Sequence, residues 1–177
     1  NWYISIDTSD GATITSPTGA PKSTWSGLVL SGYEVNYEDD FESDLGWAVS
    51  GDASDGQWNR GIPVGGGDRC DPPTDGDGSG SCYLTDNVDG NSDVDGGTTI
   101  LTSPVMDASS SPTLNYSRWY SNGSDCGGGN PMNDTMVVDF SIDDGQTWMN
   151  LETIGPDGSE VSGGWFHKEF NLAAVTG

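Results

Sequence analysis

The sequence predicts an all-β protein whose antiparallel strands pack as a sandwich or barrel. No stretch repeats its apolar residues with the 3.6-residue period of a helix. Short runs rich in β-branched and aromatic residues recur along the chain, and clusters of Gly, Asp, Asn and Pro separate them. Many short strands joined by such turns are typical of antiparallel sandwiches and barrels.

The expected strands follow these runs in chain order. They are Trp2–Ile6, Ala12–Thr15, Thr24–Leu30, Tyr33–Tyr37, Trp47–Ser50, Ser81–Thr85, Thr98–Thr102, Thr113–Tyr120, Thr135–Ile142, Asn150–Ile154 and Trp165–Asn171. The pieces between them are loops by composition, the longest being residues 63–80 and 121–134.

A domain boundary is expected near residue 32. Residues 1–32 are then either the end of a preceding β-domain or strands that dock on the main one, since about 30 residues cannot form an independent core. Residues 33–177 form the main domain. The first residues lack the features of a signal peptide, and no apolar run is long enough to span a membrane. We therefore expect an internal piece of a longer protein.

The charge balance excludes several classes of partner. The chain has 28 acidic against 5 basic residues, a formal net charge of −23. Binding to nucleic acid or to an anionic membrane surface requires basic side chains, so neither is expected. The hydrophobic content is only 32%, but seven Trp, six Tyr and four Phe indicate a folded domain rather than a disordered one.

The loop "DNVDGNSDVDGG" is the first candidate site. Its oxygen-bearing side chains alternate at Asp89, Asn91, Asp93 and Asp95. Calcium takes six to eight oxygen ligands, which such a loop can supply, whereas zinc prefers His and Cys. The sequence therefore predicts Ca²⁺ as the cofactor, and the alternative is a solvated acidic loop. A weaker second candidate is formed by Asp71, Asp75 and Asp77.

The three cysteines predict one disulfide bond. Cys70 and Cys82 flank a glycine-rich segment that a bridge between them would close. Cys126 would then be left over, which in a secreted protein suggests a partner outside the chain or a free thiol. The alternative is three free, buried cysteines in a reducing cell.

The segment "SIDDGQTW", from Ser141 to Trp148, matches the Asp-box pattern Ser-x-Asp-x-Gly-x-Thr-Trp. We interpret it as a hairpin turn of the scaffold. The Asp143 carboxylate would bind backbone N–H groups, Gly145 would adopt a positive φ, and Trp148 would pack beneath the turn.

Exposed aromatic residues are a further candidate for ligand binding, through stacking on sugar rings. They are Trp58, Trp119, Tyr120 and Trp165. Core packing and loop support are the favoured alternative. His167 is the only histidine and is expected on a strand surface, so the chain cannot supply the ligand set of a zinc peptidase. No catalytic residues are predicted, and the chain is expected not to be an enzyme.

Several motifs resemble those of MAM-type and reelin-like jelly-roll domains. The motifs are Asp40-Phe41-Glu42, Gly46-Trp47 and Trp58-Asn59-Arg60-Gly61, followed by "YLTDN" and "NSDVDGGTT". Over roughly residues 39–172 the chain is most similar to the jelly rolls appended to bacterial secreted zinc carboxypeptidases. The resemblance implies an antiparallel jelly-roll β-sandwich, preceded by the tail of an Ig-like domain. It also implies a structural calcium to which Asp40 and Glu42 contribute, and two further strands beyond residue 177.

The expected function is a non-catalytic, calcium-stabilised accessory module of a larger secreted or cell-surface protein. The resemblance alone implies that this protein is a peptidase. The expected partner is a polysaccharide or an extracellular protein surface. Two alternatives remain open: a carbohydrate-binding module, and a structural or adhesive repeat that assembles by strand exchange at an open edge.

Overall fold

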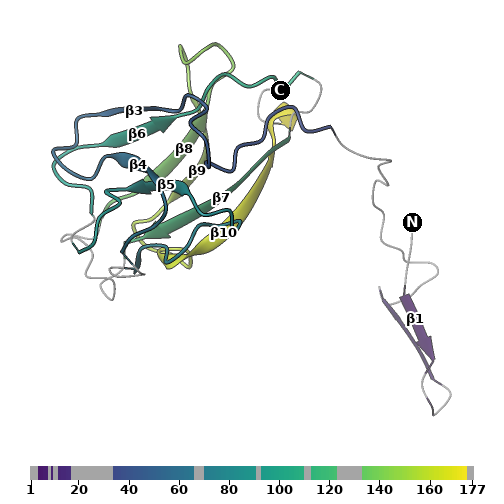
Figure 1. Ribbon diagram of the computed structural model, residues 1–177. Helices are drawn as coiled ribbons and strands as arrows, with labels where there is room; N and C mark the ends of the chain where they lie inside the picture. Colours follow the sequence, from purple (N-terminus) through teal and green to yellow (C-terminus); the bar gives the residue numbers. More distant parts are fainter. Residues whose placement is uncertain are drawn as a thin grey trace. The chain divides into compact units, whose positions relative to one another are not determined.

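A computed structural model describes residues 4–7, 9, 12–16, 34–65, 70–90, 93–109, 113–122 and 133–174. The chain forms two compact units, Asn1–Glu34 and Val35–Gly177, which we call the N-terminal unit and the main unit. In the N-terminal unit, β1 (Ile4–Asp7) pairs antiparallel with β2 (Thr13–Ser16) (Figure 1).

The main unit is all-β and its paired strands are antiparallel, as predicted. Its strands are β3 (Ala48–Gly51), β4 (Trp58–Gly61), β5 (Cys82–Thr85), β6 (Thr99–Thr102), β7 (Thr113–Ser121), β8 (Met136–Phe140), β9 (Met149–Ile154) and β10 (Ser162–Asn171). They form four two-stranded ribbons, β3–β6, β4–β5, β7–β10 and β8–β9 (Figure 1). A 3₁₀ turn, η3 (Leu172–Ala174), follows β10.

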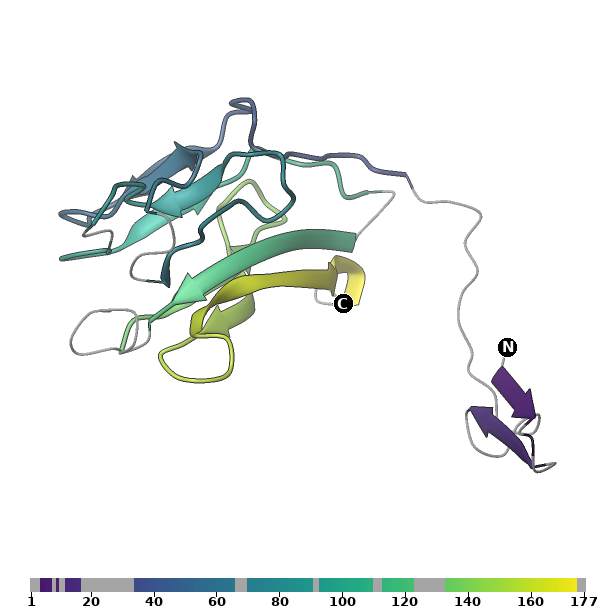
Figure 2. The same ribbon diagram turned by 60° about the horizontal axis from the view of Figure 1, so that its bottom comes forward.

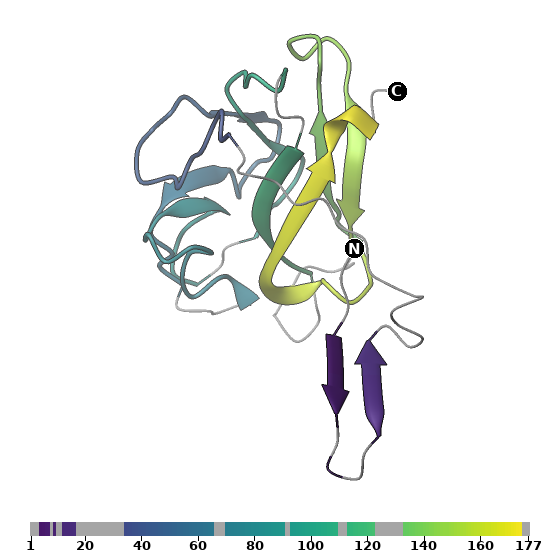
Figure 3. The same ribbon diagram turned by 90° about the vertical axis from the view of Figure 1, so that its right-hand side faces the viewer.

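The β7–β10 ribbon is the longest, and its two strands run side by side through a pronounced curve (Figures 2 and 3). Trp119 pairs with Trp165 and Tyr116 with Lys168, with an irregularity between Ser162 and Trp165. Because side chains alternate along a strand, one face of the ribbon carries the two Trp residues. The other face carries Arg118 and Lys168.

Among the described residues, the buried apolar side chains come from two ribbons, β4–β5 and β8–β9. Cys82 and Leu84 alternate along β5, and Phe140 and Ile154 come from β8 and β9. β-Branched and aromatic residues at alternating positions suit such half-buried strands. The interior that the described residues form is therefore small.

A second cluster fixes the segment that leads into β3. Phe41, Trp47 and Tyr83 pack together, with ring centroids 5.3 Å apart for Phe41 with each partner and 6.0 Å for Trp47 with Tyr83. Asp39 accepts hydrogen bonds from the Trp47 indole at 2.8 Å and from the Tyr37 hydroxyl at 3.1 Å. A buried aromatic with a polar tip is stable only when that tip is bonded, so Asp39 holds this cluster.

The structure lacks one expected strand and contains one that was not expected. Residues 34–37 are not a strand; side chains tie them down instead, since Asn36 donates to the Asp107 carbonyl and Tyr37 to Asp39. Conversely, β4 was not expected, because "WNRG" has no β-branched residue, yet it pairs along its length with β5. The expected strand at residues 24–30 lies outside the described residues.

Candidate functional site

Asp40 and Glu42 lie against the loop that leads into β5. Glu42 Oε1 accepts a hydrogen bond from the Ser81 backbone N–H, and the Asp40 carbonyl oxygen accepts one from Ser79 Oγ at 3.3 Å. A Cβ at Gly80 would lie 3.4 Å from Glu42 Oε1, so the loop backbone approaches this carboxylate closely. The structure therefore joins Asp40 and Glu42 to the second acidic segment.

Asp75 is the buried member of this segment, with 8% of its surface exposed. Its Oδ2 accepts bonds from the Gly80 N–H at 2.8 Å and from Ser79 Oγ at 3.1 Å. The bond from Gly80 is the main cause of a lowered Asp75 pKa, because donors to a carboxylate favour its ionised form. Asp77 Oδ1 accepts the Ser79 N–H at 2.8 Å. The loop is thus built around an ionised, buried carboxylate.

The acidic loop of residues 86–97 docks on residues 52–57, main chain to main chain. Asp55 and Asp95 form an antiparallel bridge, and the Ser54 N–H donates to the Asp95 carbonyl at 2.8 Å. A Cβ at Gly56, which has a φ of +81°, would lie 2.4 Å from the Asp93 carbonyl oxygen. Only glycine permits this approach, so glycine rather than the alternation of carboxylates determines how the two loops meet.

Asp86 is close to two other acids at this junction. Burial raises its pKa, and the negative charges of Asp55 and Asp93 raise it further. An acid whose pKa is raised in this way is destabilised in its charged form. Neither Asp86 nor Asp55 was among the predicted ligands. One sequence signal could have identified them. Residues 52–57 lie between β3 and β4, residues 86–97 lie between β5 and β6, and these strands pair with one another.

The predicted calcium ligands of this loop are spread over different environments. Asp89 and Asp95 are exposed, Asp93 is half-buried, and Asn91 lies outside the described residues. Within the described ranges, no group of three His, Cys, Asp or Glu side chains is close enough to hold a metal ion. The donors are the hard oxygens that Ca²⁺ prefers, but they are not arranged as a ready-made cage.

Trp119 and Trp165 are half-buried and pack edge to face, with ring centroids 5.7 Å apart. The Trp119 indole N–H donates to the Cys70 carbonyl at 2.7 Å, and that of Trp165 donates to the Thr74 carbonyl at 3.0 Å. A Cβ at Gly76 would lie 3.1 Å from the Trp165 ring. The loop of residues 70–76 therefore rests on this pair, which is the arrangement expected for loop support.

The other two residues of the predicted aromatic set lie elsewhere. Tyr120 follows Trp119 on β7 and so points to the opposite face of the ribbon. Its hydroxyl donates to the Asp134 carbonyl at 2.7 Å, and burial raises the Tyr120 pKa to about 12. Trp58 lies on β4, opposite Thr85. The structure pairs only Trp119 with Trp165 on one face.

The predicted disulfide bond between Cys70 and Cys82 is wrong. Cys70 is disulfide-bonded, but Cys82 is a free thiol whose pKa burial raises to about 11. The physical reason is that Cys82 alternates with Leu84 on the inward side of β5, where it packs as a small apolar residue. Cys126 lies outside the described residues.

The Asp-box segment forms the predicted turn, between β8 and β9. Asp143 Oδ1 accepts the Thr147 N–H at 2.8 Å, and Oδ2 accepts the Thr147 hydroxyl at 2.6 Å. Ser141 Oγ accepts the N–H of Gly145, whose φ is +80°. The Trp148 indole donates to the Gly145 carbonyl at 3.1 Å. The motif is a self-contained scaffold turn.

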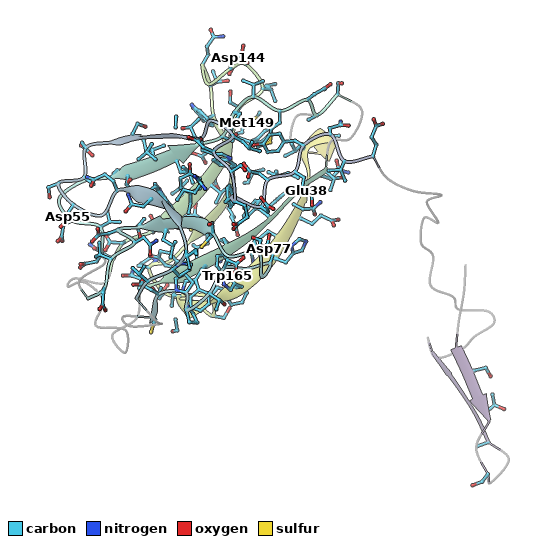
Figure 4. All side chains as sticks on the ribbon, in the orientation of Figure 1. Glu38, Asp55, Asp77, Asp144, Met149 and Trp165 are labelled. Atoms are coloured by element: carbon cyan, nitrogen blue, oxygen red, sulfur yellow. The ribbon has the colours of Figure 1, made fainter. Side chains whose placement is uncertain are left out.

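Hydrogen bonds from Thr147 lower the pKa of Asp143 to about 2. The neighbouring Asp144 lies at the tip of the turn and points outward (Figure 4). Trp148 is 51% exposed, so it packs on the turn without being enclosed. His167 is exposed on β10, as predicted.

An ion-pair network on the second face of the β7–β10 ribbon escaped the sequence analysis. Arg118, whose side chain is 4% exposed, binds Glu152 through Nε at 2.7 Å and Nη2 at 3.0 Å. Its Nη2 also binds Glu160, and Lys168 Nζ binds Glu160 at 2.8 Å. The signal was present in the sequence. Arg118 is one of five basic residues, and on a strand it shares a face with Tyr116 and Tyr120.

The bonds within the network shift the pKa values of its members. Burial favours the neutral forms, but the bonds between Arg118 and Glu152 outweigh it, so the Arg118 pKa is raised and the Glu152 pKa is lowered. The Tyr116 hydroxyl donates to Glu152 Oε1 at 2.7 Å. A shallow cavity of about 260 Å³ lies beside these charges, bounded by the loop of residues 155–161. Arg118 Nη1 is buried, and the described residues offer it no hydrogen-bond acceptor.

No family model matches the chain, and searches of curated proteins and of solved structures find no match either. In the part of the chain that the structure describes, no helix is long and apolar enough to cross a membrane.

Proposed function

We propose that the main unit is a non-catalytic, extracellular accessory module with a jelly-roll arrangement of its ribbons, in which Ca²⁺ binds the acidic loops. The observation that carries the calcium proposal is the docking of residues 86–97 on residues 52–57. This docking brings Asp55 and Asp93 near Asp86, where their charges oppose its ionisation. A divalent cation would offset that repulsion and would use only oxygen ligands.

The disulfide-bonded Cys70 supports an extracellular location, because disulfides persist in oxidising compartments. The partner we favour is an extracellular protein surface. The predicted sugar-stacking pair, Trp119 and Trp165, carries a loop and uses both indole N–H groups on it. A polysaccharide would have to displace that loop to stack on both rings.

Thermal unfolding in EDTA and in stepwise CaCl₂ tests the calcium proposal, with MgCl₂ at matched ionic strength as the ion control. Calcium should raise Tm. At a free concentration of about 100 times Kd, the linkage contributes about 2.7 kcal/mol. Asp93→Asn should weaken the calcium response. Asp144→Asn removes the same charge from the exposed tip of the Asp-box turn and should leave the response unchanged. Superimposable curves in CaCl₂ and EDTA would refute the proposal.

A second candidate function is assembly by strand addition. It is favoured by the pairing of the main unit, in which each described strand has a partner on one side only. Unpaired strand edges are templates for another chain. Sedimentation velocity across a concentration series, alone and with candidate partners, measures such assembly directly.

A further inference from the structure

The main unit contains the sequence pattern Asn-x-Ser/Thr at Asn115, Asn122 and Asn133. In this pattern, called a sequon, the asparagine amide is the acceptor of an N-linked oligosaccharide, and the hydroxyl two residues later is part of the signal. So short a pattern also arises by chance. The position of each sequon in the fold therefore decides which of them can be used.

Asn122 is a structural residue. Only 6% of its surface is exposed. Its Nδ2, the atom to which a sugar would be attached, donates to the Asp134 carbonyl at 3.2 Å, and its backbone N–H donates to the Val161 carbonyl at 2.7 Å. A bulky, polar oligosaccharide on this nitrogen would have no room in the folded unit.

Asn115 is exposed, but it lies within β7 and pairs with Glu169 on β10. Side chains two residues apart on a strand leave the same face about 7 Å apart. The Asn115 amide and the Ser117 hydroxyl therefore meet only if β7 leaves its ladder. The loop of residues 70–76 also approaches Ser117, because a Cβ at Gly76 would lie 3.5 Å from the Ser117 Cβ.

The sequon at Asn133 has neither obstacle. Asn133, Asp134 and Thr135 are all exposed, and they precede β8 without belonging to a helix or strand. Only the backbone of the middle residue is engaged: the Asp134 carbonyl accepts the Tyr120 hydroxyl at 2.7 Å and Asn122 Nδ2 at 3.2 Å. These two bonds hold the segment at the surface without using the amide or the hydroxyl of the sequon.

We propose that Asn133 is an acceptor for an N-linked glycan and that Thr135 positions its amide for the transfer. Asn133 Nδ2 would attack the anomeric carbon of an oligosaccharide carried on a lipid pyrophosphate. The new C–N bond replaces the C–O bond to the pyrophosphate, which leaves with the lipid, and the amide nitrogen loses one proton. The inference rests on the extracellular location proposed above, because this modification is typical of secreted proteins. A glycan at Asn133 would keep a protein partner away from the start of β8.

Enzymatic transfer to the full, folded chain tests this inference. The chain is incubated with a single-subunit oligosaccharyltransferase and a lipid-linked oligosaccharide, and intact-mass spectrometry counts the glycans added. The native chain should gain one glycan, which peptide mapping should locate at Asn133. Asn133→Gln and Thr135→Val should each abolish the gain, whereas Thr135→Ser keeps the hydroxyl and should retain it. Synthetic peptides that carry the three sequons are the unfolded controls, and all three should be modified.

Two results would overturn the inference. One is a native chain that gains no glycan although the Asn133 peptide does. The other is a native chain modified at Asn115 or Asn122 as readily as at Asn133. The transferase and the sugar donor are supplied in the assay, so a negative result would count against the Asn133 site and not against the extracellular location.

Discussion

Replacing Arg118 with Met removes the buried cation of the ion-pair network and should destabilise the main unit strongly. Arg118 makes two charge-assisted hydrogen bonds to Glu152, at 2.7 and 3.0 Å. Each such bond contributes about 1.5–3 kcal/mol, so the two contribute about 3–6 kcal/mol. Met also removes the buried Nη1, which finds no acceptor among the described residues and so costs about 1–3 kcal/mol in the native protein.

The variant leaves Glu152 half-buried with Lys168, 3.9 Å away, as its cation, and the total loss for a broken buried pair is about 3–5 kcal/mol. Because 16% of the Glu152 side chain is exposed, water offsets part of it, and we expect a net loss of about 3 kcal/mol. For a unit of this size Tm should fall by about 6–12 °C. Urea unfolding followed by far-UV circular dichroism, with linear extrapolation, measures the free energy.

Lys168→Met is the matched control. It also removes one positive charge from the network, but its side chain is 22% exposed, so the loss should be much smaller. Adding Glu152→Met to Arg118→Met should restore part of the stability, because no unpaired charge then stays buried. The Glu152 pKa is lowered on folding, so its contribution is present above about 4.5 and is lost as pH falls through the folded value. A loss below about 1 kcal/mol for Arg118→Met at pH 7 would refute the reasoning.

Three further predictions concern the loops. Asp143→Ala should lower Tm at pH 7. Folding lowers the Asp143 pKa from 3.8 to about 2, so the difference in Tm from the native protein should vanish as pH falls through this range. Equal sensitivity to acid in both proteins would contradict this. Asp86→Asn in EDTA should raise Tm at pH 7, because it removes repulsion from Asp55 and Asp93 and because Asn tolerates the φ of +48°; a lower Tm would argue against that repulsion. Gly56→Ala should cost more than the roughly 1 kcal/mol typical of a strained glycine site, since its Cβ would overlap the Asp93 carbonyl; chemical unfolding at an unchanged midpoint would show that the loops do not dock as described.

The fold class and most strands could be predicted because they depend on local patterns. Burial alternates along β8, and the turn between β8 and β9 is specified by Ser141, Asp143, Gly145 and Trp148 within one short segment. Each of these contacts joins residues close in sequence. Such patterns need no knowledge of distant partners, so the sequence sufficed for this hairpin.

The errors concern contacts between segments far apart in the chain. β4 forms because β5 offers it a partner, not because "WNRG" prefers a strand. The spacing of Cys70 and Cys82 suggested a loop to be closed, but spacing carries no information on which side of β5 the Cys82 thiol faces. Arg118 on β7 binds Glu152 on β9, in a different ribbon. The pattern along β7 could suggest that Arg118 needs an acidic partner, but it could not identify that partner.

In the docking of residues 86–97 on residues 52–57, the acid content of the loops and the way their backbones meet depend on different residues. These loops touch through peptide groups at Gly56 and Gly97, while several of their acidic residues are exposed. Acid content there could drift toward amides over many generations, or be edited wholesale by an engineer, with little effect on how the backbones meet. Gly56 and Gly97 have no such freedom, because any side chain there would collide with a peptide group of the facing loop. Among related sequences, these glycines should therefore be conserved more strictly than the acidic residues of the same loops.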